Sequence, residues 1–186
     1  MAGILSILGI AGSLRRASYN RAALRAAQSL TPEGARLEIC DIDGVPLFNQ
    51  DLEREPPAAV MVLKRHVRAA DAILFATPEY NHSIPGVLKN VIDWASRPYG
   101  DSAWAGKPVA VIGASSGVAG TVRAQAHLRQ VFVTLDMPAL NRPQVMIAGA
   151  AQKFDAEGNL TDDTARELIR QLLQNLVAWT RKLQAS

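Results

Sequence analysis

Three polar side chains and one arginine stand close together near the N-terminus, directly after an apolar run. They are Ser13, Arg15, Ser18 and Asn20, within Gly-Ser-Leu-Arg-Arg-Ala-Ser-Tyr-Asn. The apolar run predicts a strand and the following residues predict a helix, so the four lie on a loop that enters a helix. The first N–H groups of a helix lack intrahelical partners, and its dipole favours negative charge there. The loop is therefore expected to bind an anion, such as the terminal phosphate of a nucleotide or flavin.

The loop departs from two common phosphate-binding patterns. It does not match G-x-x-x-x-G-K-[ST], which binds ATP or GTP, or G-x-G-x-x-G, which admits a dinucleotide pyrophosphate. Side-chain hydroxyls in place of glycines suit a monophosphate, because it accepts many donors at one point. The loop alone leaves open an ordinary turn in which Ser13 or Ser18 caps the helix and the arginines are solvated.

Alternating strands and helices along the chain predict the framework that positions this loop. Apolar runs predict strands near residues 3–11, 35–42, 72–77, 107–113 and 144–149. Helical patterns occupy the intervals near residues 18–29, 60–70, 85–95, 128–135 and 161–183. We expect an α/β, flavodoxin-like three-layer sandwich, with a five-stranded parallel sheet of order 2-1-3-4-5 and helices on both faces. Residues 1–186 are expected to form a single domain.

This topology predicts that the loops after strands three and four complete the site, because ligands bind at the carboxyl ends of such strands. The first loop, residues 78–86, reads Pro-Glu-Tyr-Asn-His-Ser-Ile-Pro-Gly, and its two prolines preset backbone groups that can read a flat heteroaromatic ring. The second loop, residues 114–120, reads Ala-Ser-Ser-Gly-Val-Ala-Gly, and its small residues let a ring approach the backbone. The three loops together predict one binding site.

These motifs resemble those of the NADPH-dependent FMN reductase family, and within it the chromate and quinone reductase branch. The resemblance covers almost the entire chain and rests on the three loops above together with Leu88-Lys89-Asn90, Asp93-Trp94 and Gly106-Lys107-Pro108. It implies a flavodoxin-like fold, bound FMN, NADPH or NADH as electron donor, and a homodimer or homotetramer. One departure is Thr121 after Gly120, where many relatives carry a second glycine.

The resemblance also assigns site residues by position. It gives the FMN phosphate to Ser13, Arg15, Ser18 and Asn20, and the isoalloxazine ring to Pro78, Glu79, Tyr80 and Asn81, with Ser115, Ser116 and Gly117 at its pyrimidine end. Backbone N–H groups of residues 115–117 are expected to stabilise the negative charge of reduced FMN. No catalytic side chain and no metal are expected, because the flavin carries the chemistry. Glu79 is expected to be structural.

The implied function is an FMN-dependent NAD(P)H oxidoreductase. A ping-pong mechanism would pass electrons from NAD(P)H through FMN to a small acceptor: a quinone, an azo dye, chromate or a flavin. Two alternatives stay open, a flavodoxin-type electron carrier between protein partners and a cofactor-free flavodoxin-like interaction module. The basic net charge of +3 disfavours the carrier, since small electron shuttles tend to be acidic. The complete phosphate set disfavours the module.

Composition excludes several other classes of partner. The net charge of +3 is small and dispersed, which argues against nucleic acid as a ligand, and no apolar stretch has the length of a membrane span. The single cysteine, Cys40, cannot form an internal disulfide and lies in an apolar stretch, so we expect a core position and a cytoplasmic protein. The segment with Trp94 and Tyr99 is the expected subunit interface.

Overall fold

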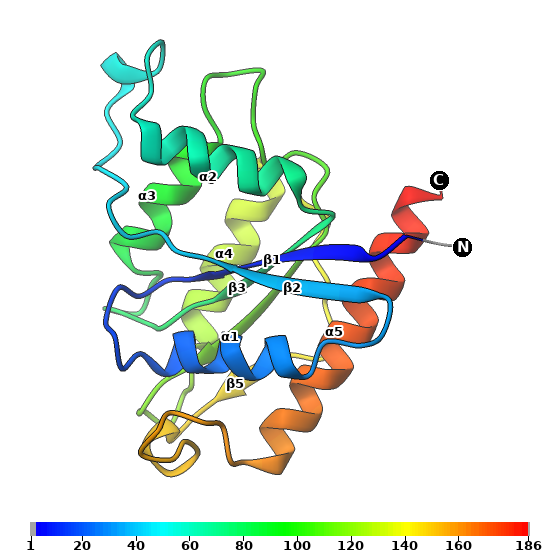
Figure 1. The fold of residues 1–186 in the computed structure, drawn as a ribbon. Coiled ribbons are helices and arrows are strands. Elements are labelled where there is room, and N and C mark those ends of the chain that lie inside the picture. Colours follow the sequence, from blue (N-terminus) through cyan, green and yellow to red (C-terminus); the bar gives the residue numbers. More distant parts are fainter. Residues whose placement is uncertain (1–2, 186) are drawn as a thin grey trace.

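The computed structural model describes residues 3–185 and has a parallel sheet between two layers of helices (Figure 1). The strands are β1 Leu5–Ala11, β2 Ala35–Cys40, β3 Ala72–Ala76, β4 Val109–Ala114 and β5 Val145–Ile147. The α-helices are α1 Tyr19–Ser29, α2 Ala58–Ala69, α3 Gly86–Ala95, α4 Val122–Thr134 and α5 Asp163–Gln184. The strand order β2-β1-β3-β4-β5 confirms the predicted flavodoxin-like fold.

The two faces of the sheet have separate cores. Successive side chains of a strand point to opposite faces. In β3, Ala72, Leu74 and Ala76 pack with α1 and α5, whereas Ile73 and Phe75 pack with α2, α3 and α4. Every residue of β3 and β4 is buried, as expected for strands that helices cover on both sides.

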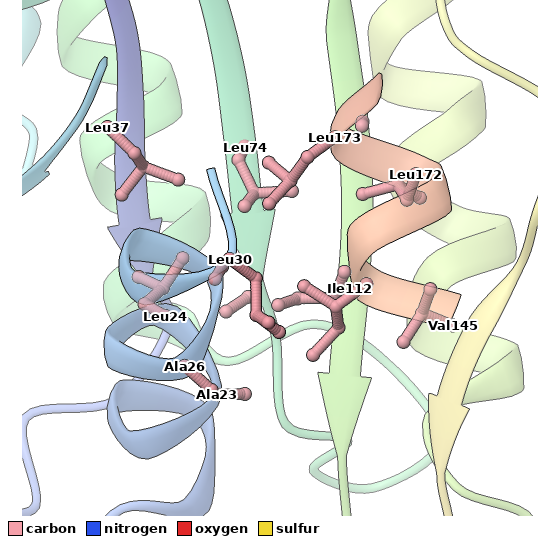
Figure 2. Close-up of a cluster of buried hydrophobic side chains, with 14 of the residues drawn as sticks. Ala23, Leu24, Ala26, Leu30, Leu37, Leu74, Ile112, Val145, Leu172 and Leu173 are labelled. Carbon is pink, nitrogen blue, oxygen red and sulfur yellow. The ribbon is translucent and has the colours of Figure 1, made fainter. Parts of the chain in front are cut away.

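Small side chains bring α1 close to the sheet. Four of its buried residues are Ala22, Ala23, Ala26 and Ala27. Figure 2 shows Leu173 of α5 beside Leu74 of β3, and Leu24 of α1 on the side of Leu37 of β2. The distance between packed elements follows the size of the side chains between them, so the alanines hold the N-terminus of α1 against the carboxyl edge of the sheet. This is the edge at which the predicted site lies.

Some element boundaries differ from the predicted ones. β1 begins at Leu5, two residues later than expected, because the partner strand begins at Ala35, opposite Leu5. β4 begins at Val109, since Pro108 has no N–H to donate to a ladder. Within residues 3–185, none of the helices combines the length and the apolar character that a membrane crossing requires.

The side chain of Trp94 lies in the interior and not on the surface of the expected subunit interface. Its side chain is 1% exposed, its Nε1–H donates to the carbonyl of Pro46 at 2.8 Å, and its ring meets that of Phe48 edge-on. Trp94 therefore fastens the β2–α2 connection to the protein interior. Tyr99 stays exposed, with the guanidinium of Arg97 3.9 Å from its ring centroid.

Candidate functional site

The structure brings the three predicted loops together at the carboxyl edge of the sheet. The N–H of Gly12 donates to the carbonyl of Ala76 at 2.8 Å, which joins the β1–α1 loop to the end of β3. A cavity of about 210 Å³ lies between the loops. Nine of the eleven predicted site residues line it: Ser13, Arg15, Ser18, Asn20, Pro78, Glu79, Tyr80, Ser115 and Ser116. The two that do not are Asn81 and Gly117.

The β1–α1 loop has the donor pattern of an anion site. Ser18 is the N-cap of α1, and its Oγ accepts from the N–H groups of Asn20 and Arg21, which leaves the hydroxyl hydrogen to donate elsewhere. Within residues 3–185, the backbone N–H groups of Arg16 and Ala17 have no hydrogen-bond partner. These donors lie at a helix N-terminus, where a phosphate is stabilised by both N–H groups and dipole.

The cavity also places charge and hydroxyl groups for a monophosphate. Ser13 is 5% exposed, and its Oγ accepts from the N–H of Arg15 at 3.4 Å. The guanidinium of Arg15 is exposed and lies 5.7 Å from the ring centroid of Tyr19, which lines the cavity as well. Tyr19 was not predicted, because its aromatic ring in the first turn of an amphipathic helix gives no sequence signal for a site.

Asn20 makes contacts within the framework that the sequence did not predict. Its Nδ2 donates to the carbonyl of Ala114 and its Oδ1 accepts from the N–H of Ala114, both at 2.8 Å. The last residue of β4 that pairs with β3 is Ile112, opposite Ala76. Ala114 lies beyond this pair, so on the side of β4 that faces β3 it has no partner in the strand. The Asn20 amide takes the place of a neighbouring strand and positions α1 against β4. With 2% of its surface exposed, it is part of the framework.

The β3–α3 loop folds back through a tight hairpin turn. The backbones of Tyr80 and Ser83 exchange two hydrogen bonds of 3.0 Å, and the two residues between them, Asn81 and His82, have φ of 51° and 63°. Two successive positive φ angles are the signature of a type I′ turn, which asparagine tolerates well and histidine less well. The turn leaves half of Tyr80 exposed at the cavity and carries Asn81 away from it.

The carboxylate of Glu79 caps the N-terminus of α4, where the N-cap residue Thr121 makes no side-chain capping bond. Its Oε2 accepts from the N–H groups of Arg123 and Ala124 at 2.9 and 3.1 Å, and its Oε1 accepts from the Arg123 guanidinium at 2.9 Å. Desolvation raises the pKa of this carboxyl, but the hydrogen bonds outweigh it and hold the pKa below its ordinary value of 4.5. This geometry agrees with the structural role predicted for Glu79.

The β4–α4 loop offers fewer backbone donors than predicted. The N–H of Ser115 donates to the carbonyl of Ile147, and the N–H of Gly117 donates to Ser115 Oγ at 3.1 Å. Among residues 115–117, only the N–H of Ser116 has no partner within the described chain. The N–H of Ser116 is therefore the one left to face a ligand, because the N–H of Ser115 joins the loop to β5 and the N–H of Gly117 bonds within the loop.

Thr121, the departure from the family pattern, faces the interior. A Cβ on Gly113 would lie 1.7 Å from Thr121 Oγ1 and 2.7 Å from the carbonyl of Thr77, so only glycine fits at the end of β4. Thr121 is fully buried, and its Oγ1 accepts from Gln125 Nε2 at 3.1 Å. Thr121 does not line the cavity between the three loops.

Comparison with known proteins now adds to this geometry. The family model for NADPH-dependent FMN reductase matches residues 5–152. The chain belongs to this family. An NAD(P)H-dependent FMN reductase of Pseudomonas aeruginosa is 55% identical over 99% of this chain and 100% of its own length. A 2-hydroxy-1,4-benzoquinone reductase of a Burkholderia species is 42% identical, with 95% and 97% covered.

A solved structure of a flavoenzyme has the same fold as this chain. The flavoenzyme NAD(P)H:(acceptor) oxidoreductase FerB of Paracoccus denitrificans superposes with a TM-score of 0.88. It is 36% identical, and the match covers 96% of this chain and 98% of that protein. The family-model match over residues 5–152 spans β1–β5 and so includes all three loops of the cavity.

Proposed function

We propose that this protein is an FMN-dependent NAD(P)H oxidoreductase that delivers electrons to quinones. One observation carries the proposal: Ser13, Arg15 and Ser18 of the β1–α1 loop line the same cavity as Pro78, Tyr80 and Ser116 of the two loops that would flank the ring. The donor set suits a phosphate monoester, and the small, preset backbone of the other loops suits a flat ring. Similarity to proteins named FMN and quinone reductases supports it.

The side chains bind and orient, whereas FMN, when bound, supplies the transfer of electrons from NAD(P)H to the acceptor. Ser13, Arg15 and Ser18 hold the phosphate through two hydroxyls and a guanidinium fork. The N–H of Ser116 is the backbone donor left to meet negative charge at the pyrimidine end. Glu79 moves no proton, since its carboxylate is engaged by three hydrogen bonds. Asn20 holds the start of α1 against the end of β4 through its two hydrogen bonds to Ala114.

Quinones are the acceptor class that the site favours. The half-exposed ring of Tyr80 lines the cavity, so a flat molecule has an aromatic surface beside which it can approach the flavin ring. Proteins named quinone reductase from Pseudomonas putida and NADPH:quinone oxidoreductase from Arabidopsis thaliana are 44% and 43% identical to this chain. Azo dyes, chromate and free flavin are further candidate acceptors for the same open face.

We also propose a homodimer or homotetramer in the cytoplasm. A groove of about 590 Å³ between α3 and α4, lined by Ile84, Lys89, His127 and Val131 among others, adjoins the Tyr80–Ser83 turn and would place a second subunit beside the site. Light scattering of the purified protein gives its mass in solution and separates monomer, dimer and tetramer. The single cysteine, Cys40, is buried and free, which suits a reducing compartment.

The function is tested by an anaerobic titration of the FMN-loaded protein with NADPH and then NADH, followed through the visible flavin absorption. Loss of that absorption at one equivalent, and its return on adding a quinone, is the expected result. A bound flavin that neither nucleotide bleaches would favour an electron carrier between proteins. Failure to retain flavin at all would favour a cofactor-free module.

A further inference from the structure

A second and larger cavity adjoins the proposed phosphate site. It encloses about 470 Å³, within the range of small-molecule sites, and lies between the N-terminal turn of α1 and the segment 151–158. In Figure 1 this segment, drawn in yellow to orange, passes beside the start of α1. Arg15, Ser18 and Tyr19 line both cavities. The second cavity, called the outer cavity here, therefore begins where the phosphate loop ends.

Arginines dominate one wall of the outer cavity. Arg15, Arg16 and Arg25 all line it and are all exposed. Within residues 3–185, Arg16 makes no hydrogen bond or ion pair, and Arg25 reaches the carbonyl of Gly158 through a long contact of 3.4 Å. Guanidinium groups bind phosphates through paired N–H donors. This wall can therefore take a second phosphate beside the first.

Carboxylates stand on the opposite wall, but one of them is already engaged. Asp155 accepts from the backbone N–H and the side-chain amide of Asn159 at 2.7 and 2.9 Å, which closes its own turn. Glu157 is exposed and lines the cavity. A carboxylate in a nucleotide site can accept hydrogen bonds from ribose hydroxyls, as the acidic residue of dinucleotide folds does.

An aromatic pair forms the floor. The rings of Tyr19 and Phe154 are 5.2 Å apart with a 36° tilt, so α1 and the segment after η2, Ala150–Gln152, are packed together. Phe154 is bridged to Leu160, and the N–H of Thr161 donates to the carbonyl of Lys153 at 2.9 Å. These bonds hold the floor in place without a ligand. Such a floor gives a base an apolar surface to lie on.

We propose that the outer cavity binds an adenosine phosphate, the adenylate half of a dinucleotide. Arg16 and Arg25 take the phosphate, the Tyr19–Phe154 floor takes the base, and Glu157 takes ribose hydroxyls. The proposal rests on the proposed function, since the FMN phosphate site defines where the ligand begins. The same chemistry has two sources: FAD, whose adenylate is joined to the flavin phosphate, or NADPH, whose adenosine half carries a 2′-phosphate.

The first arm of the test uses adenosine 2′,5′-bisphosphate and calorimetry on the FMN-loaded protein. The double variant Arg16→Ala/Arg25→Ala removes the two arginines that line only the outer cavity. Arg21→Ala is the matched control, because Arg21 lies on the same helix, contacts Asp41 and lines neither cavity. If NADPH is the source, the bisphosphate binds the wild-type protein and the Arg21 variant equally, and the double variant about tenfold more weakly or worse.

The second arm compares FAD with FMN on the apoprotein by quenching of flavin fluorescence. If FAD is the source, the wild-type protein binds FAD more tightly than FMN, and the double variant loses that preference while its affinity for FMN stays the same. Glu157→Ala removes the carboxylate that accepts from the ribose hydroxyls and is expected to weaken bisphosphate binding; binding equal to that of the wild type would contradict this role of Glu157.

The proposal is overturned if the wild-type protein neither binds the bisphosphate nor prefers FAD, or if the double variant matches the wild type in both arms. These outcomes are distinct from failure of the proposed function. That failure appears as an apoprotein that binds no FMN, and the bisphosphate titration on the same apoprotein then still reports on the outer cavity.

Discussion

Glu79 should stabilise the protein as a helix cap more than as an ion pair. Its carboxylate serves two backbone N–H groups at the start of α4, its side chain is 9% exposed, and the facing Arg123 side chain is 47% exposed. Loss of a side-chain cap costs about 0.5 to 2 kcal/mol, and burial with a favourable helix dipole places Glu79 near about 2 kcal/mol. An ion pair with an exposed partner contributes about 0 to 1 kcal/mol.

We therefore expect Glu79→Ala to lower the free energy of unfolding by about 2 kcal/mol, and Arg123→Ala by less than about 1 kcal/mol. Urea unfolding of the apoprotein measures both, since Arg123→Ala keeps the backbone N–H that Glu79 accepts from. Equal losses in the two variants would show that the ion pair, and not the cap, carries the stabilisation.

The pH dependence of the same contact gives a second readout. Because hydrogen bonding lowers the pKa of Glu79 in the folded state, the folded protein binds this proton more weakly than the unfolded chain does. The stabilisation is complete above the ordinary pKa of 4.5 and is lost as the pH falls through the lowered value. The gap in stability between the wild type and Glu79→Gln should therefore shrink below that pH. A constant gap would refute the reasoning.

Three further predictions concern the framework. Asn20→Ala leaves the N–H and carbonyl of Ala114 buried and unpaired, and should lower the free energy of unfolding by about 2 to 4 kcal/mol; a urea midpoint like that of the wild type would contradict this. Gly113→Ala should destabilise even when combined with Thr121→Gly, because the carbonyl of Thr77 remains 2.7 Å from the new Cβ, as thermal unfolding of both variants will show. Burial, and to a lesser degree the charge of Asp41, raises the pKa of Cys40 to about 11, so alkylation by iodoacetamide should be slow at neutral pH and still accelerate above pH 9; fast alkylation at neutral pH would disprove it.

The sequence could predict what local patterns determine. Continuous apolar runs such as residues 72–77 identified the buried strands, and their alternation with helical patterns fixed the parallel topology. The topological rule then predicted that loops far apart in sequence meet at one edge of the sheet. Nine of the eleven predicted residues line the resulting cavity, because their positions follow from strand ends rather than from side-chain packing.

Contacts between distant residues could not be predicted in this way. Asn20 was placed on the phosphate because its amide is a good donor, whereas the structure pairs it with Ala114, 94 positions away. Trp94 was predicted to belong to the subunit-interface segment, whereas the hydrogen bond from its Nε1 to Pro46 makes burial favourable. In both cases the partner lies on an element whose position only the folded chain defines.

The outer cavity was missed for the same reason. Arg25 looks like a solvent-facing helix residue in the sequence, and Phe154 lies far from it along the chain. Only the packing of Phe154 on Tyr19 turns this surface into a walled cavity.

The affinity of the apoprotein for FMN in Arg15→Ala tests the central claim most directly, with Arg21→Ala as the control. Loss of a charge-assisted contact to the phosphate costs about 1.5 to 3 kcal/mol, so the dissociation constant should rise by roughly 10- to 150-fold in Arg15→Ala and stay unchanged in Arg21→Ala. Equal affinity for FMN in Arg15→Ala and the wild type would contradict the assignment of the β1–α1 loop as the phosphate site.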